Sequence, residues 1–217
     1  MQTDFRAGVV AVIGRPNVGK SSLLNRILKY KLSIVSAKPQ TTRDNILGLY
    51  NGAASQILFV DTPGIHAPLN KLGERLVERA VSGLEDANVV LYVVTIDDRP
   101  EQSENDRILK VLRDYPGIPV VLAVNKVDLP GSRSKILPLI DRFTKKMKLR
   151  DIVPVSAKDG TNDEVLVKTL ESLLPVAAPL YPDDMITDRT ERFIAQELIR
   201  EKVIACTDEE VPHSVAV

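Results

Sequence analysis

The sequence predicts an α/β fold: a mostly parallel sheet with one antiparallel edge strand and helices on both faces. Two observations predict it. Short apolar runs rich in β-branched residues alternate along the chain with segments of helical spacing. The runs are also apolar throughout rather than at every second position, which indicates strands buried on both faces.

The predicted elements follow one another in a regular order. Parallel strands are expected at residues 8–13, 57–60, 88–96, 118–124 and 152–155. The run at 46–50 is joined to 57–60 by a turn-forming segment, which predicts a hairpin whose outer strand is the antiparallel edge. The spacing of apolar residues predicts helices around 23–27, 72–84, 108–112, 136–140 and 165–173.

Prolines at positions 175, 179 and 182 mark the end of this pattern, before a charged, helix-like run. We therefore expect a domain over residues 1–174, a linker over 175–187 and a separate segment over 188–217. In the helix of that segment, we expect the apolar side chains to face one way, with no sheet in this chain to cover; they are Ile194, Leu198 and Ile199.

The composition limits the classes of function. Lys+Arg and Asp+Glu both count 29, so binding to nucleic acid or to an anionic membrane would need a local basic patch. Cys206 is the one cysteine, which excludes an internal disulfide and fits a reducing compartment. The sequence has no apolar run long enough to span a bilayer and no signal peptide at its start, so we expect a cytoplasmic protein.

Residues 14–21, GRPNVGKS, match the phosphate-loop pattern G-x-x-x-x-G-K-[ST] at every fixed position, between a predicted strand and a predicted helix. The glycines allow successive N–H groups to point at phosphate oxygens, and the helix adds its positive end. Lys20 can neutralise the β and γ phosphates, and the Ser21 hydroxyl can bind Mg²⁺. The sequence thus predicts a P-loop NTPase whose phosphate-binding residues are Gly14, Arg15, Pro16, Asn17, Val18, Gly19, Lys20, Ser21 and Ser22.

A second motif, Asn125–Lys126–Val127–Asp128, favours guanine over adenine. An ionised Asp only accepts hydrogen bonds, so Asp128 can pair with the N–H and amino groups of guanine, whereas adenine presents an acceptor at that edge. Asn125 can brace the loop, and the stem of Lys126 can lie over the base. A backbone N–H after the last predicted strand can meet the guanine oxygen, from the run Ser156, Ala157 and Lys158.

Two further segments are expected to respond to the γ-phosphate. Asp61 can hold Mg²⁺ through a water, and the N–H of Gly64 can meet the γ-phosphate. A threonine of the polar loop at residues 40–43 can complete the Mg²⁺ shell, and we favour Thr42 over Thr41. The metal-binding candidates are therefore Ser21, Thr42 and Asp61, and the nucleotide-binding candidates after the strand at 57–60 are Asp61, Thr62, Pro63, Gly64 and Ile65.

The wording of these motifs resembles the translation-factor-like branch of small GTPases, and most closely the bacterial Era family. The matching segments are GRPNVGKSSLLN, KPQTTRDNILG, FVDTPGIHAP, VNKVDLP, VSAKDG and, after the linker, PDDMITDRTERFIAQELIREKV. The resemblance covers essentially the whole chain. It implies a GTPase switch in assembly of the small ribosomal subunit that binds small-subunit ribosomal RNA near its 3′ end through a C-terminal KH domain. A cytoplasmic location, with peripheral association with the inner membrane, is a further expectation.

The segment at 188–217 departs from the family pattern. A KH domain needs a G-x-x-G loop, which this segment does not contain. Residues 175–217 also hold nine acidic residues against four Lys+Arg, the wrong balance for binding a phosphate backbone. We therefore expect an incomplete KH-type domain, from a truncated product or a fragment, that does not bind RNA by itself.

Hydrolysis needs an arrangement other than the usual one, because Ile65 stands where other small GTPases carry a glutamine that orients water. The resemblance implies that Asn17 helps to hold K⁺, although an asparagine there also suits a left-handed turn. His66 is not assigned as a base, since phosphoryl transfer needs little base help. The catalytic candidates are Asn17, Lys20, Thr42 and Gly64.

Two other functions fit the same motifs. One is a nucleotide-gated binding module with negligible turnover. The other is a sister GTPase that serves tRNA modification or assembly of the large subunit.

Overall fold

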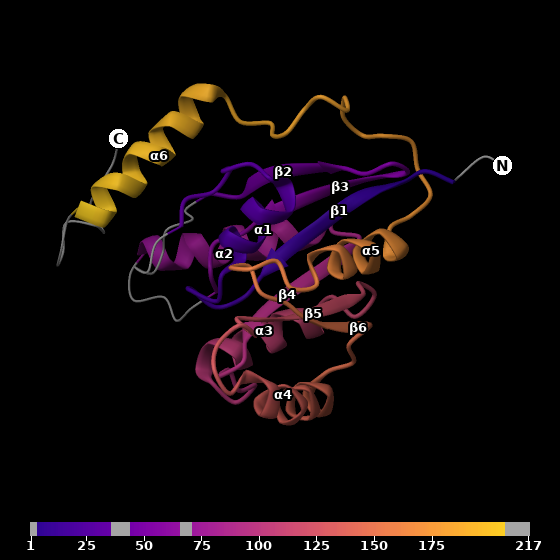
Figure 1. The fold of residues 1–217 in the computed structure, drawn as a ribbon, viewed down its shortest axis with the longest axis vertical. Helices are drawn as coiled ribbons and strands as arrows, with labels where there is room; N and C mark the ends of the chain where they lie inside the picture. The colour runs from indigo at the N-terminus through magenta and orange to yellow at the C-terminus, as the bar shows by residue number, and fades with distance from the viewer. Residues whose placement is uncertain (1–3, 36–43, 66–70, 207–217) are drawn as a thin grey trace.

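A computed structural model of the chain describes residues 4–35, 44–65 and 71–206. Its centre is a six-stranded sheet in the order β2-β3-β1-β4-β5-β6 (Figure 1). The strands are β1 (Arg6–Ile13), β2 (Ile46–Asn51), β3 (Ser55–Asp61), β4 (Val89–Thr95), β5 (Val120–Asn125) and β6 (Asp151–Pro154). The helices are α1 (Lys20–Leu28), α2 (Lys71–Glu85), α3 (Ser103–Arg113), α4 (Ser132–Lys146), α5 (Asp163–Leu173) and α6 (Glu191–Cys206).

The pairing of the strands confirms the predicted fold class. β2 runs antiparallel to β3 at one edge, and the other neighbouring strands are parallel. In the register of the parallel pairs, Val12 lies opposite Asp61, and Thr95 lies opposite Asn125. The carboxyl ends of the four central strands therefore meet at one edge of the sheet, where an open α/β fold binds its ligand.

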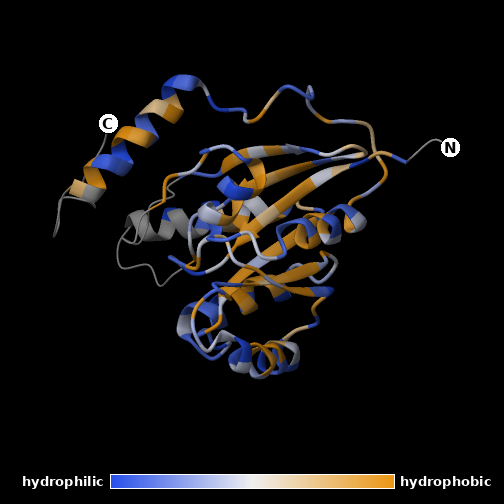
Figure 2. Cartoon of the chain, viewed as in Figure 1, coloured by the Kyte–Doolittle hydropathy of each residue, from blue (hydrophilic) through white to orange (hydrophobic). Residues whose placement is uncertain are grey.

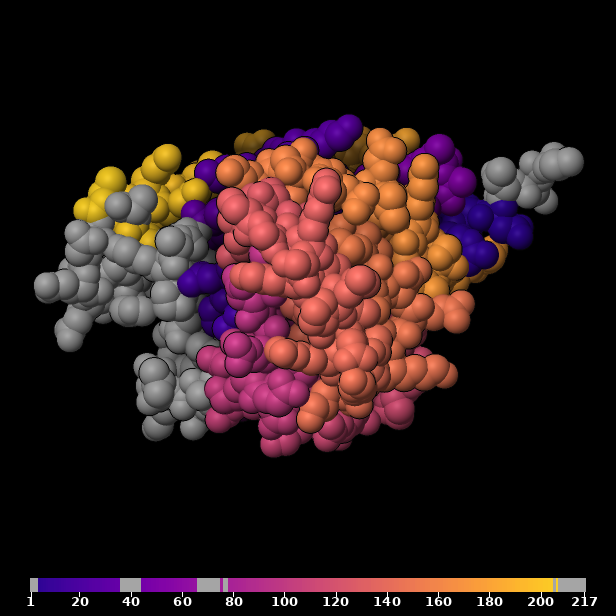
Figure 3. Space-filling model, turned by 60° about the horizontal axis from the view of Figure 1, so that its bottom comes forward, coloured from indigo at the N-terminus to yellow at the C-terminus, as the bar shows by residue number. Residues whose placement is uncertain are grey.

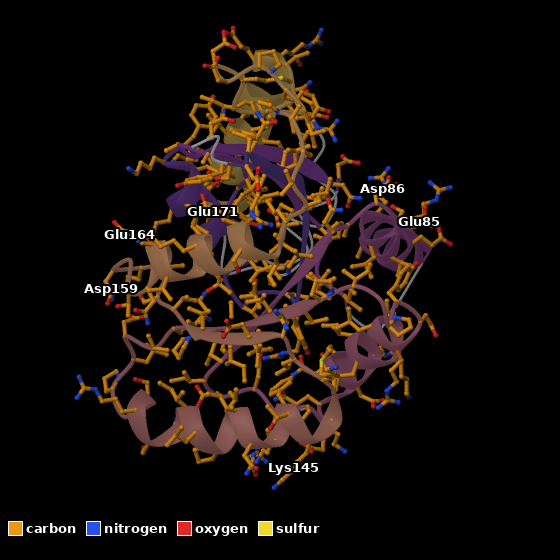
Figure 4. The ribbon with its side chains drawn as sticks, turned by 90° about the vertical axis from the view of Figure 1, so that its right-hand side faces the viewer. Glu85, Asp86, Lys145, Asp159, Glu164 and Glu171 are labelled. Atoms are coloured by element: carbon orange, nitrogen blue, oxygen red, sulfur yellow. The ribbon has the colours of Figure 1, made fainter. Side chains whose placement is uncertain are left out.

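The strands of the sheet are hydrophobic along much of their length (Figure 2). Two clusters of buried apolar residues pack on the sheet, one on each face. α1 and α5 cover one face, with Leu24 and Leu170 in its core cluster. α2, α3 and α4 cover the other face, with Leu112 and Phe143 in the second cluster. In Figure 4 the acidic side chains of α5 and those at the end of α2 project on opposite sides of the sheet. Because helices cover both faces of the sheet, the strands are continuous apolar runs in the sequence.

The observed strands differ from the predicted ranges by one or two residues at their ends. The run predicted at 118–124 forms β5 from Val120, because Ile118 belongs to a turn in which its N–H bonds the carbonyl of Tyr115. At the other end, Asn125 is the last residue of β5 rather than the first residue after it. The base-reading motif is thereby anchored directly to the sheet.

The chain after α5 stays attached to the sheet. The linker runs along β2, where the N–H of Leu49 donates to the carbonyl of Ile186 at 2.8 Å. α6 follows, and its Ile194 packs with Leu32 and Ile46. The expectation that Ile194, Leu198 and Ile199 face one way is wrong, since Ile194 is buried whereas Leu198 and Ile199 are exposed. The buried residues of α6 are instead Ile194, Arg200 and Ile204, and Ile194 and Glu201 contact the first domain. Within the described residues, no helix is long and apolar enough to cross a membrane.

Candidate nucleotide-binding site

The predicted phosphate loop connects β1 to α1 and is shaped by left-handed backbone at Asn17 (φ 62°) and Gly19 (φ 95°). A Cβ added at Gly19 would lie 2.4 Å from the side-chain nitrogen of Asn125. Glycine is therefore required at this position both by the backbone and by the close approach of the base-reading motif. The conformation of Asn17 fits the left-handed-turn interpretation of that residue.

Lys20 is only 6% exposed and folds back over the loop. Its Nζ donates to the carbonyls of Gly14 at 3.2 Å and Arg15 at 3.1 Å. Burial lowers the pKa of Lys20 to about 8, against the opposing effect of the nearby Asp61 carboxylate. The ammonium is thus held by weak neutral acceptors, which phosphate oxygens can replace.

The two described metal candidates lie together at the ends of β3 and the phosphate loop. The Ser21 hydroxyl donates to Oδ2 of Asp61 at 2.8 Å. Oδ1 of Asp61 is buried and has no hydrogen-bond partner in the described part of the chain. Burial raises the pKa of Asp61, although Lys20 and the Ser21 hydroxyl lower it. A carboxylate oxygen without a partner beside a hydroxyl is a donor set that fits Mg²⁺. The third candidate, Thr42, lies outside the described residues, as does Thr41.

The segment after β3 is packed against the phosphate loop. The buried Thr62 donates through its hydroxyl to the carbonyl of Val12 at 2.7 Å. A Cβ added at Gly64 would lie 2.8 Å from the nitrogen of Pro16, so glycine is needed for this contact. The N–H of Ile65 donates to the carbonyl of Gly14 at 3.2 Å.

The side chain of Ile65 is buried in the core cluster that α2, α3 and α4 cover. A buried apolar side chain is unable to orient a water molecule. His66, the residue that follows, lies outside the described residues.

A cavity of about 400 Å³ adjoins the phosphate loop at the ends of β5 and β6. Its lining joins the predicted base-reading residues to the start of α1: Gly19, Ser22, Asn125, Lys126, Asp128, Leu129, Ala157 and Lys158. Leu129 was not predicted. It directly follows the four-residue motif, and no spacing rule for that motif extends to it.

Asn125 ties three loops together. Its Nδ2 donates to the carbonyl of Val18 at 2.8 Å, and its Oδ1 accepts from the N–H of Lys126 at 2.8 Å and of Ala157 at 3.0 Å. Lys126 itself has left-handed backbone (φ 65°), and its Nζ donates to the carbonyl of Asn17 at 3.0 Å. The side chain of Asn125 is thus a brace between the phosphate loop and the base cavity.

Asp128 lies in the same cavity, where the hydroxyl of Ser156 donates to its Oδ1 at 2.8 Å. The N–H groups of Ser156 and Ala157 donate to Thr161 and Asn125. Within the described residues, this leaves the N–H of Lys158 without a hydrogen bond among the three groups predicted to meet the guanine oxygen.

Arg26 supports this last loop from α1 and was not predicted. Its guanidinium donates to the carbonyl of Asp159 at 2.8 Å and to the carboxylate of Asp163 at 2.6 Å. These partners are more than 130 positions away along the chain, so no sequence pattern connects them to Arg26.

Comparison with protein families agrees with this geometry. A family model described as "50S ribosome-binding GTPase" matches residues 9–126. Among curated proteins, the chain is similar to GTPase Era of Geotalea uraniireducens, with 45% identity over all of this chain and 72% of that protein. It is also similar to GTPase Era of Clostridium beijerinckii, with 46% identity over 98% of this chain and 70% of that protein.

Two solved structures have nearly the same fold. One is Era in complex with MgGDPNP and nucleotides 1506–1542 of 16S ribosomal RNA, with a TM-score of 0.91 and 43% identity over 97% of this chain and 70% of that chain. The other is a single-substitution variant of Aquifex aeolicus Era bound to GDP and aluminium fluoride, with a TM-score of 0.90 and 43% identity over 96% of this chain and 70% of that chain.

Proposed function

The chain belongs to the Era family of GTPases, and from this premise we propose that it hydrolyses GTP as a switch in assembly of the small ribosomal subunit. The observation that carries the proposal is the cavity beside the phosphate loop, in which Asp128 and Asn125 lie next to Gly19. An acceptor at the base edge and a loop of N–H groups for the phosphates are what guanine nucleotides need.

Mg²⁺ is the expected cofactor, and Ser21 and Asp61 would hold it. When bound, it neutralises charge on the β and γ phosphates. Lys20 would exchange its present carbonyl partners for phosphate oxygens. Gly64 would offer its N–H to the γ-phosphate, and Thr42 would complete the metal shell only while that phosphate is present. The difference between the two nucleotide states would then be carried by the segments around Thr42 and Gly64.

The attacking water must be oriented by a group other than Ile65, because the side chain of this residue is buried in the core. We propose that Asn17 takes part in holding K⁺ beside the β–γ bridge, where a cation stabilises the charge of the transition state. Turnover is expected to be faster in K⁺ than in Na⁺ at equal ionic strength. Equal rates in the two salts would contradict a role for K⁺.

Phosphate release under single-turnover conditions, with protein in excess over GTP, tests whether the chain hydrolyses GTP. We expect GTP to be consumed and the reaction to be lost in Lys20→Ala. If the wild type binds GTP but releases no phosphate over hours, the chain acts as a binding module instead.

Ribosomal RNA is the proposed partner, because a structure with 43% identity is Era in complex with a 16S ribosomal RNA fragment. We further propose that residues 188–217 belong to a KH-type RNA-binding unit, and that the protein acts in the cytoplasm with peripheral association with the inner membrane. Because residues 188–217 are not expected to bind RNA by themselves, the test joins this chain to the remaining part of an Era relative, of which the chain covers 72%. In that fusion, an RNA with the 3′-end sequence of small-subunit ribosomal RNA should bind more tightly than a scrambled RNA of equal length. Preference for a transfer RNA or large-subunit RNA would favour the role of a sister GTPase.

A further inference from the structure

Arg15, inside the phosphate loop, forms an ion pair with Asp98. The carboxylate of Asp98 is completely buried, whereas the side chain of Arg15 is one-quarter exposed. Asp98 belongs to the loop between β4 and α3, which carries none of the predicted nucleotide motifs. A buried charge is costly unless it is paired, so this contact must hold whenever the loop has its present shape.

Asp98 is itself fixed to the end of β4. One carboxylate oxygen accepts the hydrogen bond from Arg15, and the other accepts from the N–H of Thr95 at 2.9 Å. The N–H of Asp98 in turn donates to the carbonyl of Thr95 at 3.0 Å. Thr95 pairs with Asn125 in the sheet. The position of the carboxylate is therefore set by the rigid centre of the fold.

Arg15 transmits this position to the phosphate-binding lysine. The carbonyl of Arg15 accepts from Nζ of Lys20 at 3.1 Å, and the preceding carbonyl, of Gly14, accepts from the same Nζ at 3.2 Å. The guanidinium of Arg15 is thus bound to Asp98 while its main chain is bound to Lys20. A shift of Arg15 would move both acceptors of that ammonium.

We propose that Asp98 is a positioning residue for the phosphate loop, which it acts on through Arg15. Its carboxylate keeps the loop in the conformation that binds phosphate before the nucleotide arrives. The loop therefore loses less conformational freedom when the nucleotide binds, and this makes the affinity of the site for nucleotide higher. This inference rests on the proposed guanine-nucleotide site.

The test is the dissociation constant of the Mg²⁺ complex of a fluorescent GDP, measured for four variants. Asp98→Asn keeps the size of the side chain and an acceptor for Thr95, but it removes the charge that pairs with Arg15. We expect it to bind GDP about tenfold more weakly, the loss that corresponds to one hydrogen bond to a charged group. Asp97→Asn is the matched control, because Asp97 is the neighbouring carboxylate, is exposed and pairs with Lys135 on α4. It should bind GDP as the wild type does.

Arg15→Gln and the double variant Arg15→Gln/Asp98→Asn show whether Asp98 acts through Arg15. If it does, the double variant binds GDP no more weakly than Arg15→Gln alone. The inference is overturned if Asp98→Asn binds like the wild type, or if the double variant loses the product of both single effects. Should Asp98→Asn fail to fold, an unchanged affinity in Arg15→Gln overturns it equally. Failure of the proposed function is distinct, because the wild type itself would then not bind GDP.

Discussion

Lys20 carries its charge in a place with almost no solvent, and this makes nucleotide binding dependent on pH. Burial lowers its pKa to about 8 in the free protein. Phosphate oxygens favour the charged form, so binding raises that pKa and takes up a proton once the pH exceeds 8. We predict a constant GDP affinity below pH 8 and a loss approaching tenfold per pH unit above it. Titration of a fluorescent GDP between pH 6.5 and 9.5, values chosen to span about one and a half units on each side, measures it.

Lys20→Arg separates this effect from ionisation of the nucleotide. Arginine stays charged throughout this range, so any pH dependence that remains in the variant belongs to the ligand. The prediction concerns the ratio of the GDP affinity of the wild type to the GDP affinity of Lys20→Arg. A ratio that does not change across pH 8 would contradict the lowered pKa of Lys20.

Asp128 should decide which base the cavity accepts. Asp128→Asn keeps an acceptor for the Ser156 hydroxyl, which now lies 2.8 Å from Oδ1. It replaces the other acceptor by a donor, so guanine loses a partner and xanthine, with an oxygen at that edge, gains one. We predict that GTP affinity falls about a hundredfold while xanthosine triphosphate binds more tightly than to the wild type. Competition binding with both nucleotides measures the switch, and unchanged preference for GTP would remove Asp128 from the base-reading role.

Among the elements, α4 packs on the sheet through two buried apolar residues, of which Phe143 is the larger and Leu139 the smaller. Phe143 is fully buried and meets the ring of Tyr92 edge to face, with 5.8 Å between the centroids. We predict that Phe143→Ala lowers the free energy of unfolding by about 3–5 kcal/mol, because the cavity cannot close. The control is Leu137→Ala on the same helix, where the side chain is 74% exposed and the cost should stay under about 0.5 kcal/mol. Urea denaturation measures the free energy of unfolding of both variants. Equal losses in the two would contradict the burial of Phe143 between α4 and the sheet.

The elements that could be predicted from the sequence are those whose signal is local. The β-branched apolar runs predict the strands, and the glycines and polar residues at the ends of these runs predict the nucleotide-binding motifs. The ends of strands are not specified by this signal, as the start of β5 shows, because a turn residue and a strand residue can be equally apolar. The contacts by which residues of distant segments hold the site in place could not be predicted. Arg15 and Asp98 are 83 positions apart, and nothing in either segment specifies the other.

The same limit explains the error at the C-terminal helix. The spacing of Ile194, Leu198 and Ile199 predicts a stripe, but spacing alone does not say which residues of a helix contact a neighbour. In the structure the position of α6 is set by long-range contacts: Lys31 pairs with Glu201 at 2.6 Å, and Ile194 enters the cluster of Leu32 and Ile46. Helix formation is a local property, whereas docking depends on the tertiary surface that the rest of the chain presents.

On the scale of the whole molecule, the linker and α6 lie across the antiparallel edge of the sheet, far from α4 (Figure 1). In the space-filling view of Figure 3, α4 dominates the near face and α6 lies at its margin. The linker covers β2 through the bond between Leu49 and Ile186 and through the hydroxyl of Thr187, which donates to Leu47 at 2.6 Å. An exposed edge strand tends to pair with other chains, and here the linker occupies hydrogen-bonding groups of that edge.

The attachment of α6 should be separable from the nucleotide site, because its apolar contact is a small cluster of its own. We predict that Ile194→Ala weakens docking by about 2 kcal/mol, at the lower end of the cost of truncating a buried isoleucine. Hydrogen exchange in α6 should then rise about thirtyfold, while exchange in β1, β4 and β5 stays the same. Ile199→Ala on the same helix is the control, since that side chain is 52% exposed and should leave exchange unchanged. If Ile194→Ala instead raises exchange throughout the sheet, α6 is an integral part of the first domain, and the boundary expected at residues 175–187 is wrong.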